Sequence, residues 1–189
     1  MDIVLDNIRK TYGDNVVFDG FSARFPEGRL RCIMGPSGGG KTTLLRLVLG
    51  LERPDGGTIS GVPEKKAAVF QEDRLCPGAS AVENVLLVTG RRKAGEAREL
   101  LAALGLGDSL DKPARELSGG MRRRAALARA MLADAELLAL DEPFKGLDEE
   151  SRRTAMEILR RYLPGRTTLF VTHDREEAES FDRNILFIP

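Results

Sequence analysis

The stretch Gly35-Pro36-Ser37-Gly38-Gly39-Gly40-Lys41-Thr42 decides the fold of this chain. It matches the pattern GxxxxGK[ST] and lies between a short apolar run, residues 29–34, and a segment of helical character, residues 41–49. Glycines let backbone N–H groups curl around phosphate oxygens, and the N-terminus of the following helix adds partial positive charge. A glycine-rich turn that merely precedes a helix is the alternative, and the matched flanks count against it. The motif predicts a phosphate-binding loop in which Lys41 reaches the β- and γ-phosphates of a nucleotide and the Thr42 hydroxyl binds Mg²⁺.

Two carboxylates, Asp141 and Glu142, follow the apolar run 137–140. Ligands of doubly wound α/β sheets gather beyond the carboxyl ends of the strands, so we expect both side chains near the phosphates. Asp141 is expected to hold Mg²⁺ through water, and Glu142 to polarise the attacking water as a general base. A solvated strand end is the alternative. The phosphate loop disfavours it, because a magnesium nucleotide site requires an acid of this kind.

The remaining pattern predicts an α/β fold. Apolar and polar residues alternate over the first 30 positions between glycine-containing turns, which is typical of short antiparallel strands. Later apolar runs are continuous, as in parallel strands buried on both faces. The expected strands are 29–34, 66–70, 137–140 and 168–172, and the expected helices are 41–49, 96–104, 121–132 and 149–162. We predict one domain over 1–189: a P-loop NTPase core of mainly parallel sheet, with an N-terminal antiparallel β subdomain and a helical subdomain inserted at about 72–116.

Composition and charge exclude several classes of function. Lysine plus arginine (29) equals aspartate plus glutamate (29), and this balance argues against a general nucleic-acid binder. The two cysteines form no CxxC pair and predict neither a disulfide framework nor a zinc site; Cys32 is expected to be buried in a strand. The N-terminal residues have no long apolar core, so we expect no signal peptide. No apolar run approaches the roughly 20 residues that span a bilayer, so other chains would have to bring this one to a membrane.

The segment Leu117-Ser118-Gly119-Gly120-Met121 resembles the signature sequence of ABC transporter ATPases, which normally reads LSGGQ. By itself the string is a turn in which Ser118 can cap a helix. The chain is similar to that family in the order of its phosphate loop, glutamine, signature, acid pair and histidine. The resemblance covers essentially the whole chain and implies a helix from about residue 118.

The resemblance implies roles for further residues. Tyr12 matches the aromatic that stacks on adenine, with Val17 near the ribose or base; an aromatic of the strand core is the alternative for Tyr12. Gln71 matches the loop glutamine that contacts Mg²⁺ or the attacking water and senses the membrane subunit. Asp148 matches the loop aspartate that crosses a dimer interface. His173, the only histidine in the chain, matches the switch histidine on the γ-phosphate, whereas a lone histidine is more often structural.

The site implied by the resemblance takes ATP and Mg²⁺ as cofactors. Its implied catalytic residues are Glu142, His173 and Gln71, and its implied metal ligands are Thr42, Gln71 and Asp141. The implied nucleotide-binding residues are Tyr12, Val17, Gly35, Pro36, Ser37, Gly38, Gly39, Gly40, Lys41, Thr42, Thr43, Ser118, Gly119, Gly120 and Asp148.

The family pattern also implies a site shared between two subunits. One subunit's phosphate loop binds ATP, while Ser118 and Gly120 of the other cap the γ-phosphate with a hydroxyl, N–H groups and a helix N-terminus. The implied partners are a second ATP-binding subunit (the same chain or a paralogue), transmembrane permease subunits and, for an importer, a solute-binding protein; no nucleic acid is implied. Such a subunit is expected in the cytoplasm, peripheral on the inner face of the cell membrane.

Three departures from the family pattern stand out. Met121 replaces the glutamine of the signature, and a thioether cannot donate a hydrogen bond. The aspartate loop reads Lys145-Gly146-Leu147-Asp148 rather than Ser-Ala-Leu-Asp. The chain also stops at Pro189, without the C-terminal extension of many relatives. Because Ser118 and its glycines remain, activity is expected to survive.

Three functions compete. The segments Phe70–Leu75 and Ser80–Val85 resemble the ATP-binding subunits of nitrate, sulfonate and taurine importers, which favours an importer. An export or lipid-handling ATPase shares nearly all of these motifs. A soluble ABC ATPase of DNA repair or translation is the third, and the paired cassettes or long coiled coils of that class are absent from the sequence. The transported molecule is recognised by other subunits.

Overall fold

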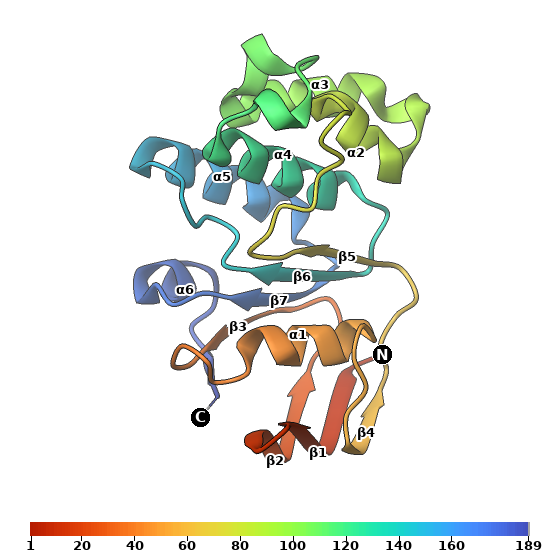
Figure 1. Cartoon of the computed structure of the whole chain (residues 1–189), viewed down its shortest axis with the longest axis vertical. Coiled ribbons are helices and arrows are strands. Elements are labelled where there is room, and N and C mark those ends of the chain that lie inside the picture. The colour runs from red at the N-terminus through yellow and green to blue at the C-terminus, as the bar shows by residue number, and fades with distance from the viewer. Residues whose placement is uncertain (189) are drawn as a thin grey trace. The chain divides into compact units, whose positions relative to one another are not determined.

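The chain forms two compact units in the computed structural model, which describes residues 1–188 (Figure 1). The first unit comprises residues 1–66, 136–141 and 163–188, and the second comprises residues 67–135 and 142–162. Each unit therefore collects segments that are distant in sequence. The candidate site residues are divided between the two units.

An antiparallel sheet in the first unit consists of β1 (Ile3–Tyr12), β2 (Asn15–Phe25) and β4 (Gly56–Ser60), in the order β2-β1-β4. Tyr12 pairs with Asn15 across the expected turn at Gly13-Asp14. The alternating pattern of the sequence sends one set of side chains into the core: Ile3, Leu5, Ile8, Phe18 and Phe25 are buried. The N-terminal antiparallel strands predicted from the sequence are confirmed.

Parallel strands form the rest of the first unit. They run in the order β6 (Leu137–Asp141), β7 (Thr167–Val171), β3 (Leu30–Met34) and β8 (Leu186–Phe187). Every residue of β6 and β7 is buried, as their continuous apolar pattern requires. Helix α1 (Lys41–Leu49) packs against β6 and β7, and α6 (Arg175–Phe181) packs against β3. Figure 1 shows α1 between these parallel strands and the antiparallel sheet.

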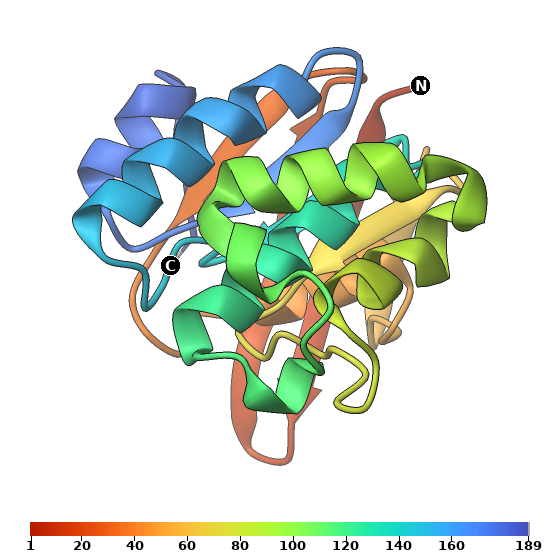
Figure 2. The ribbon, with the colours of Figure 1, turned by 90° about the horizontal axis from the view of Figure 1, so that it is seen from above.

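The second unit is mainly helical. β5 (Lys66–Val69) leads into it, and its main helices are α2 (Ala81–Thr89), α3 (Ala94–Leu101), α4 (Gly119–Leu132) and α5 (Glu149–Tyr162). The short turns are η1 (Arg91–Lys93), η2 (Ala102–Leu106), η3 (Gly107–Ser109) and η4 (Ala114–Glu116). Helices α2 and α3 pack against α4, which the yellow-green to green ribbons of Figure 2 show from above. Residues at helical spacing on α4, among them Ala125, Ala128 and Leu132, form a buried stripe along the helix.

The α/β fold predicted from the sequence is confirmed. Strands β4 and β8 and helix α6 were not among the expected elements, because they are short or glycine-rich and carry too few apolar residues to show a period. Helix α2 lies within the predicted helical subdomain, although no helix with these bounds was expected. The predicted helix 96–104 is α3 continued by the wide turn η2, in which Gly105 has φ 78° and breaks the helical path. Within residues 1–188, no helix combines the length and apolar character needed to cross a membrane.

The buried amide of Asn84 provides a test of how the helical segment is held. Asn84 on α2 is fully buried; its Oδ1 accepts from Cys76 N–H at 2.7 Å, and its Nδ2 donates to the carbonyls of Cys76, Ala79 and Ser80. Replacing it by alanine leaves the N–H of Cys76 and several carbonyls without this partner, which should lower the free energy of unfolding by about 1–3 kcal/mol. Urea unfolding followed by circular dichroism measures the loss. The exposed Asn184→Ala is the control, and an equal unfolding midpoint for the two variants would contradict this role.

Candidate nucleotide-binding site

The phosphate loop joins β3 to α1 at the carboxyl end of the parallel strands in the first unit. The Lys41 ammonium folds over the loop and donates to the carbonyls of Gly35 at 2.8 Å and Pro36 at 2.6 Å. The first turn of α1 holds no acidic side chain, so nothing on the helix itself offsets the partial positive charge of its N-terminus. The loop thus combines an ammonium with a helix N-terminus, an arrangement suited to phosphate oxygens.

Gly40 is required by packing as well as by backbone geometry. It precedes α1 with φ 86°, a conformation that residues with a side chain adopt only with strain. A Cβ added there would lie 2.5 Å from Cγ1 of Val17 and 2.9 Å from Cζ of Phe18, both on β2. Val17, predicted near the ribose or base, is therefore held beside the loop. This contact ties the antiparallel sheet to the start of α1.

Thr42 and Asp141 meet although 99 positions separate them in the sequence. The Thr42 hydroxyl donates to Oδ2 of Asp141 at 2.6 Å. Asp141 is the last residue of β6 and is buried. Two oxygen donors from two different elements match the hard ligands that Mg²⁺ takes when phosphate and water complete its coordination. The residues present therefore fit the predicted metal.

Tyr12 lies exposed at the end of β1, which excludes the alternative of an aromatic in the strand core. Its hydroxyl donates to Glu52, whose carboxylate also pairs with Arg46 of α1 at 3.1 Å. Partial desolvation and the hydrogen bond to Glu52 raise the pKa of Tyr12, so the hydroxyl remains a donor at neutral pH. Sequence reasoning missed Glu52, which fixes the orientation of this ring.

His173 follows β7 at the same end of the parallel strands as the phosphate loop. The preceding Thr172 is buried; its N–H donates to the carbonyl of Ile33, near the end of β3, at 3.4 Å. Asp174 caps α6 by accepting from the N–H groups of Glu176 and Glu177. His173 itself is exposed. Strand β7 therefore brings the histidine next to the strand that carries the loop.

In the second unit, the signature segment begins helix α4. Ser118 is exposed and caps the helix, its Oγ accepting from the N–H of Met121 at 3.2 Å. The methionine takes part through its backbone, so the loss of the usual glutamine leaves the cap intact. Gly120 lies beside Leu147, and a Cβ on it would meet Cδ2 of that residue at 3.6 Å. The signature and the aspartate loop are thus neighbours.

Glu142 precedes the aspartate loop, and Asp148 is its last residue. Glu142 has an unusual positive φ of 48°, and its carboxylate forms a 2.8 Å ion pair with Lys145. Lys145 is the departure noted in the aspartate loop, and the structure gives it a role as the partner of the candidate base. Asp148 is exposed and accepts from the Ser151 N–H at 2.9 Å; this bond lowers the pKa of its carboxyl.

Gln71 follows β5 and is exposed, whereas its neighbour Phe70 is buried. The carbonyl of Phe70 accepts a hydrogen bond from Arg123 of α4. Arg123 also binds Asp73 and the carbonyls of Glu142 and Pro143. Sequence reasoning missed this residue, because it lies in a run of three arginines whose members look alike before their burial is known.

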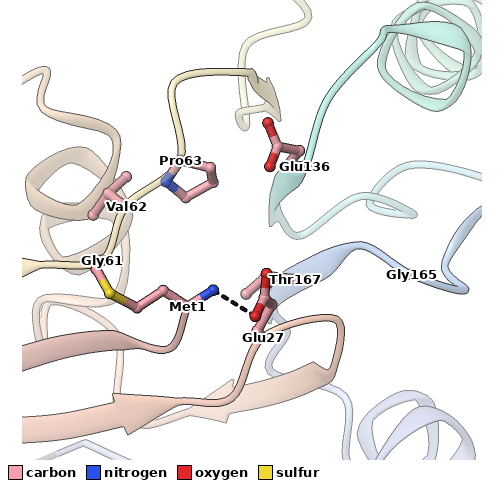
Figure 3. Close-up of a pocket in the computed structure, with 8 residues that line it drawn as sticks. All are labelled: Met1, Glu27, Gly61, Val62, Pro63, Glu136, Gly165 and Thr167. Carbon is pink, nitrogen blue, oxygen red and sulfur yellow. Dashed lines mark ion pairs between the residues drawn. The ribbon is translucent and has the colours of Figure 1, made fainter.

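A separate cavity in the first unit lies away from the phosphate loop. It has a volume of about 360 Å³ and is lined by residues that include Glu27, Gly61, Glu136 and Thr167 (Figure 3). Thr167 begins β7 and Glu136 precedes β6, so the cavity lies at the amino ends of the strands whose carboxyl ends carry the candidate site. The N-terminal ammonium of Met1 pairs with Glu27 there at 2.5 Å. None of the predicted site residues lines it.

The model of the ABC transporter family matches residues 18–145, which include the phosphate loop, Gln71, the signature and the acid pair. The chain belongs to the ABC transporter family. The resemblance inferred from its motifs is confirmed.

Individual relatives of this ABC cassette include importers and an exporter. The aliphatic sulfonates import ATP-binding protein SsuB 1 of Nocardia farcinica is 41% identical over 93% of this chain and 73% of that protein. The protein of the same kind numbered SsuB 3 in Paraburkholderia xenovorans is 44% identical over 95% of this chain and 73% of its own length. The Nod factor export ATP-binding protein I of Burkholderia orbicola is 41% identical, over 92% of this chain and 63% of that protein.

Solved structures agree with the family assignment. A dimeric ATP-binding cassette in a post-hydrolysis state, bound to ADP and Pi, matches this ABC cassette with a TM-score of 0.87 and 28% identity, over 98% of this chain and 94% of that one. A dimeric bacterial ABC transporter cassette matches with a TM-score of 0.88. This chain is thus an ATP-binding and ATP-hydrolysing subunit of the ABC transporter type, and its importer relatives favour import over export.

The contact between Gly40 and β2 predicts unequal costs at two glycines of the loop. Gly38 and Gly40 have φ of 82° and 86°, but a Cβ on Gly38 would meet no atom within 4 Å. Gly38→Ala should therefore cost only the backbone strain, about 1–2 kcal/mol. Gly40→Ala should lose roughly 1–3 kcal/mol more, because Val17 and Phe18 must also move. Urea unfolding of both variants measures the difference, and matching midpoints would refute the packing argument.

Proposed function

We propose that this ABC cassette binds ATP with Mg²⁺ on its phosphate loop, dimerises around the nucleotide, and couples hydrolysis to import through transmembrane permease subunits. The observation that carries this proposal is the 2.6 Å hydrogen bond between Thr42 and Asp141. It places the hydroxyl of the phosphate loop and the buried carboxylate of β6 at one point, as a magnesium nucleotide site requires.

Residues of the first unit supply nucleotide binding in this proposal. Lys41 exchanges the carbonyls of Gly35 and Pro36 for β- and γ-phosphate oxygens. The N–H groups of 35–42 and Thr43 surround the phosphates, and Tyr12 stacks on the adenine beside Val17. His173 donates to the γ-phosphate. The exposure of Tyr12 and His173 supports these roles, because both side chains have to reach a ligand.

Residues of the second unit supply the base and the surface for a second subunit. Glu142 accepts the proton of the attacking water, and Gln71 orients that water. Together with Thr42 and Asp141 of the first unit, Gln71 would hold Mg²⁺, which would neutralise charge that develops on the phosphates. Ser118, Gly119 and Asp148 are exposed, which supports their use on the ATP of a second copy or a paralogue. Peripheral association with the inner face of the cell membrane then depends on the permease.

Glu142→Gln tests the chemistry and the dimer together. The amide cannot accept the proton, so turnover should fall by about 10²–10⁴-fold while ATP still binds. ATP that is bound and not hydrolysed should hold two subunits together, giving a dimer on size-exclusion chromatography with ATP and Mg²⁺. Turnover at the parent rate would remove Glu142 from the role of base.

Lys41→Ala tests whether the phosphate loop binds the nucleotide. Loss of a charge-assisted contact should weaken ATP affinity by about tenfold or more in calorimetry. Lys112→Ala, which removes an exposed lysine of the second unit, is the matched control and should bind as the parent does. Equal affinity for the two variants would place the nucleotide elsewhere.

We further propose that the imported solute is a small organic anion of the aliphatic sulfonate type, received from a solute-binding protein. The two sulfonate importer relatives at 41% and 44% identity support this class. Deleting the gene should stop growth on an aliphatic sulfonate as sole sulfur source and leave growth on sulfate intact. The parent gene should restore growth, and Glu142→Gln should not. Normal growth of the deletion strain on sulfonate, with a defect on nitrate as nitrogen source, would assign another solute.

A further inference from the structure

Arg123 is a fully buried cation in the second unit. It lies on α4 and is 2% exposed. Its Nε donates to the carbonyl of Pro143 at 2.9 Å, and its Nη atoms donate to the carbonyls of Phe70 and Glu142 and to Oδ1 of Asp73, the last at 3.2 Å. A planar guanidinium offers five N–H donors in a fixed fork, so it can hold more acceptors over a wider span than the three donors on the single nitrogen of an ammonium.

The acceptors of Arg123 flank two residues with proposed catalytic roles. Phe70 and Asp73 lie on either side of Gln71, and the other acceptors are the carbonyls of Glu142 and of the next residue, Pro143. One side chain therefore joins the backbone around the candidate water-orienting residue to the backbone of the candidate base. The hydrogen bonds to Phe70, Glu142 and Pro143 reach main-chain carbonyls, so the influence of Arg123 on the two catalytic side chains passes through the backbone.

The backbone of Glu142 needs such support. Its φ of 48° is a left-handed conformation that costs on the order of 1–3 kcal/mol for a residue other than glycine and persists only where neighbours impose it. Arg123 holds its carbonyl, and Lys145 pairs with its carboxylate at 2.8 Å. Releasing the carbonyl would let the main chain relax and turn the carboxylate away from its present direction.

A purely structural role explains Arg123 poorly. Burial of a cation is costly, and a buried cation is weak evidence for stability even when it is paired. The segment after Gln71 is already tied to α4 by Arg129, which donates to the carbonyls of Asp73 at 3.0 Å and Arg74 at 2.8 Å. What Arg123 adds is the connection to Glu142 and Pro143.

We propose that Arg123 is a positioning residue for ATP hydrolysis, which holds the segment of Gln71 and the backbone of Glu142 in a fixed relation. This inference rests on the proposed roles of these two residues. It predicts that Arg123 affects the chemical step much more than nucleotide binding, because its hydrogen bonds reach the segments of Gln71 and Glu142, whereas binding is proposed to depend mainly on Lys41 and the phosphate loop.

Turnover of the full chain tests the proposal in Arg123→Gln and Arg123→Lys. Rates are expressed per chain that binds a fluorescent ATP analogue, so that misfolded protein is not counted. We expect kcat to fall by about a hundredfold in the glutamine variant, the cost of misplacing a catalytic group by about 1 Å, while KM stays within about threefold. Lysine keeps the positive charge but lacks the planar set of N–H donors of the guanidinium, so kcat of Arg123→Lys should remain low. Arg98→Gln is the control, because Arg98 forms two hydrogen bonds with exposed Asp111 and contacts neither segment; it should turn over as the parent does.

A double-mutant cycle separates this inference from the proposed function. If Arg123 acts through Glu142, adding Arg123→Lys to Glu142→Gln should cause no further loss in single-turnover hydrolysis. An equal loss in both backgrounds, a kcat restored by lysine, or a defect confined to KM would overturn the positioning role while Glu142 remains the base. A fully active Glu142→Gln would instead overturn the proposed function on which the inference rests.

Discussion

The hydrogen bond from the Thr42 hydroxyl to Asp141 is the constraint on which the nucleotide site depends. It joins the first turn of α1 to the last residue of β6, two elements that the sequence places 99 positions apart. The bond is possible only because β6, β7 and β3 are parallel neighbours, so that their carboxyl ends meet at one edge. The apolar runs of these strands thus matter for the site. They let the strands be buried side by side in one sheet, and the order of the strands brings hydroxyl and carboxylate together.

Much of this arrangement could be predicted from the sequence, because the decisive features are local. The glycines of 35–42, the apolar run before Asp141 and the cap at Ser118 each have a physical cause within a few residues. Short elements such as β4 were not predicted, because Gly56 and Gly57 interrupt the alternation of apolar and polar residues that marks a strand. The motif predicts a glycine at position 40, but it does not reveal the contact with Val17. A side chain at position 40 would clash with Val17, and that residue lies on another strand.

Residues that act through distant partners could not be found this way. Arg122, Arg123 and Arg124 are identical in type and adjacent, yet only the middle one is fully buried. Glu52 is one acid among many in the sequence, yet it fixes Tyr12 and pairs with Arg46. In both cases the side chain gains its role from contacts with residues that are distant in the sequence, among them Phe70 for Arg123 and Tyr12 for Glu52. No spacing rule for helices or strands carries that information.

Asp141 and Glu142 are adjacent in the sequence, but different interactions hold them in place. Asp141 ends a buried strand, so its carboxylate is fixed by the ladder of β6 with β7. Glu142 leaves the strand with φ 48° and depends on side chains of the second unit, Arg123 at its carbonyl and Lys145 at its carboxylate. A ligand of Mg²⁺ has to be present whenever nucleotide binds, whereas a base is needed only when water attacks. Strand pairing suits the metal ligand, because it keeps Asp141 in place at all times. An ion pair to a half-exposed lysine suits the base, because it can be broken without disturbing the sheet.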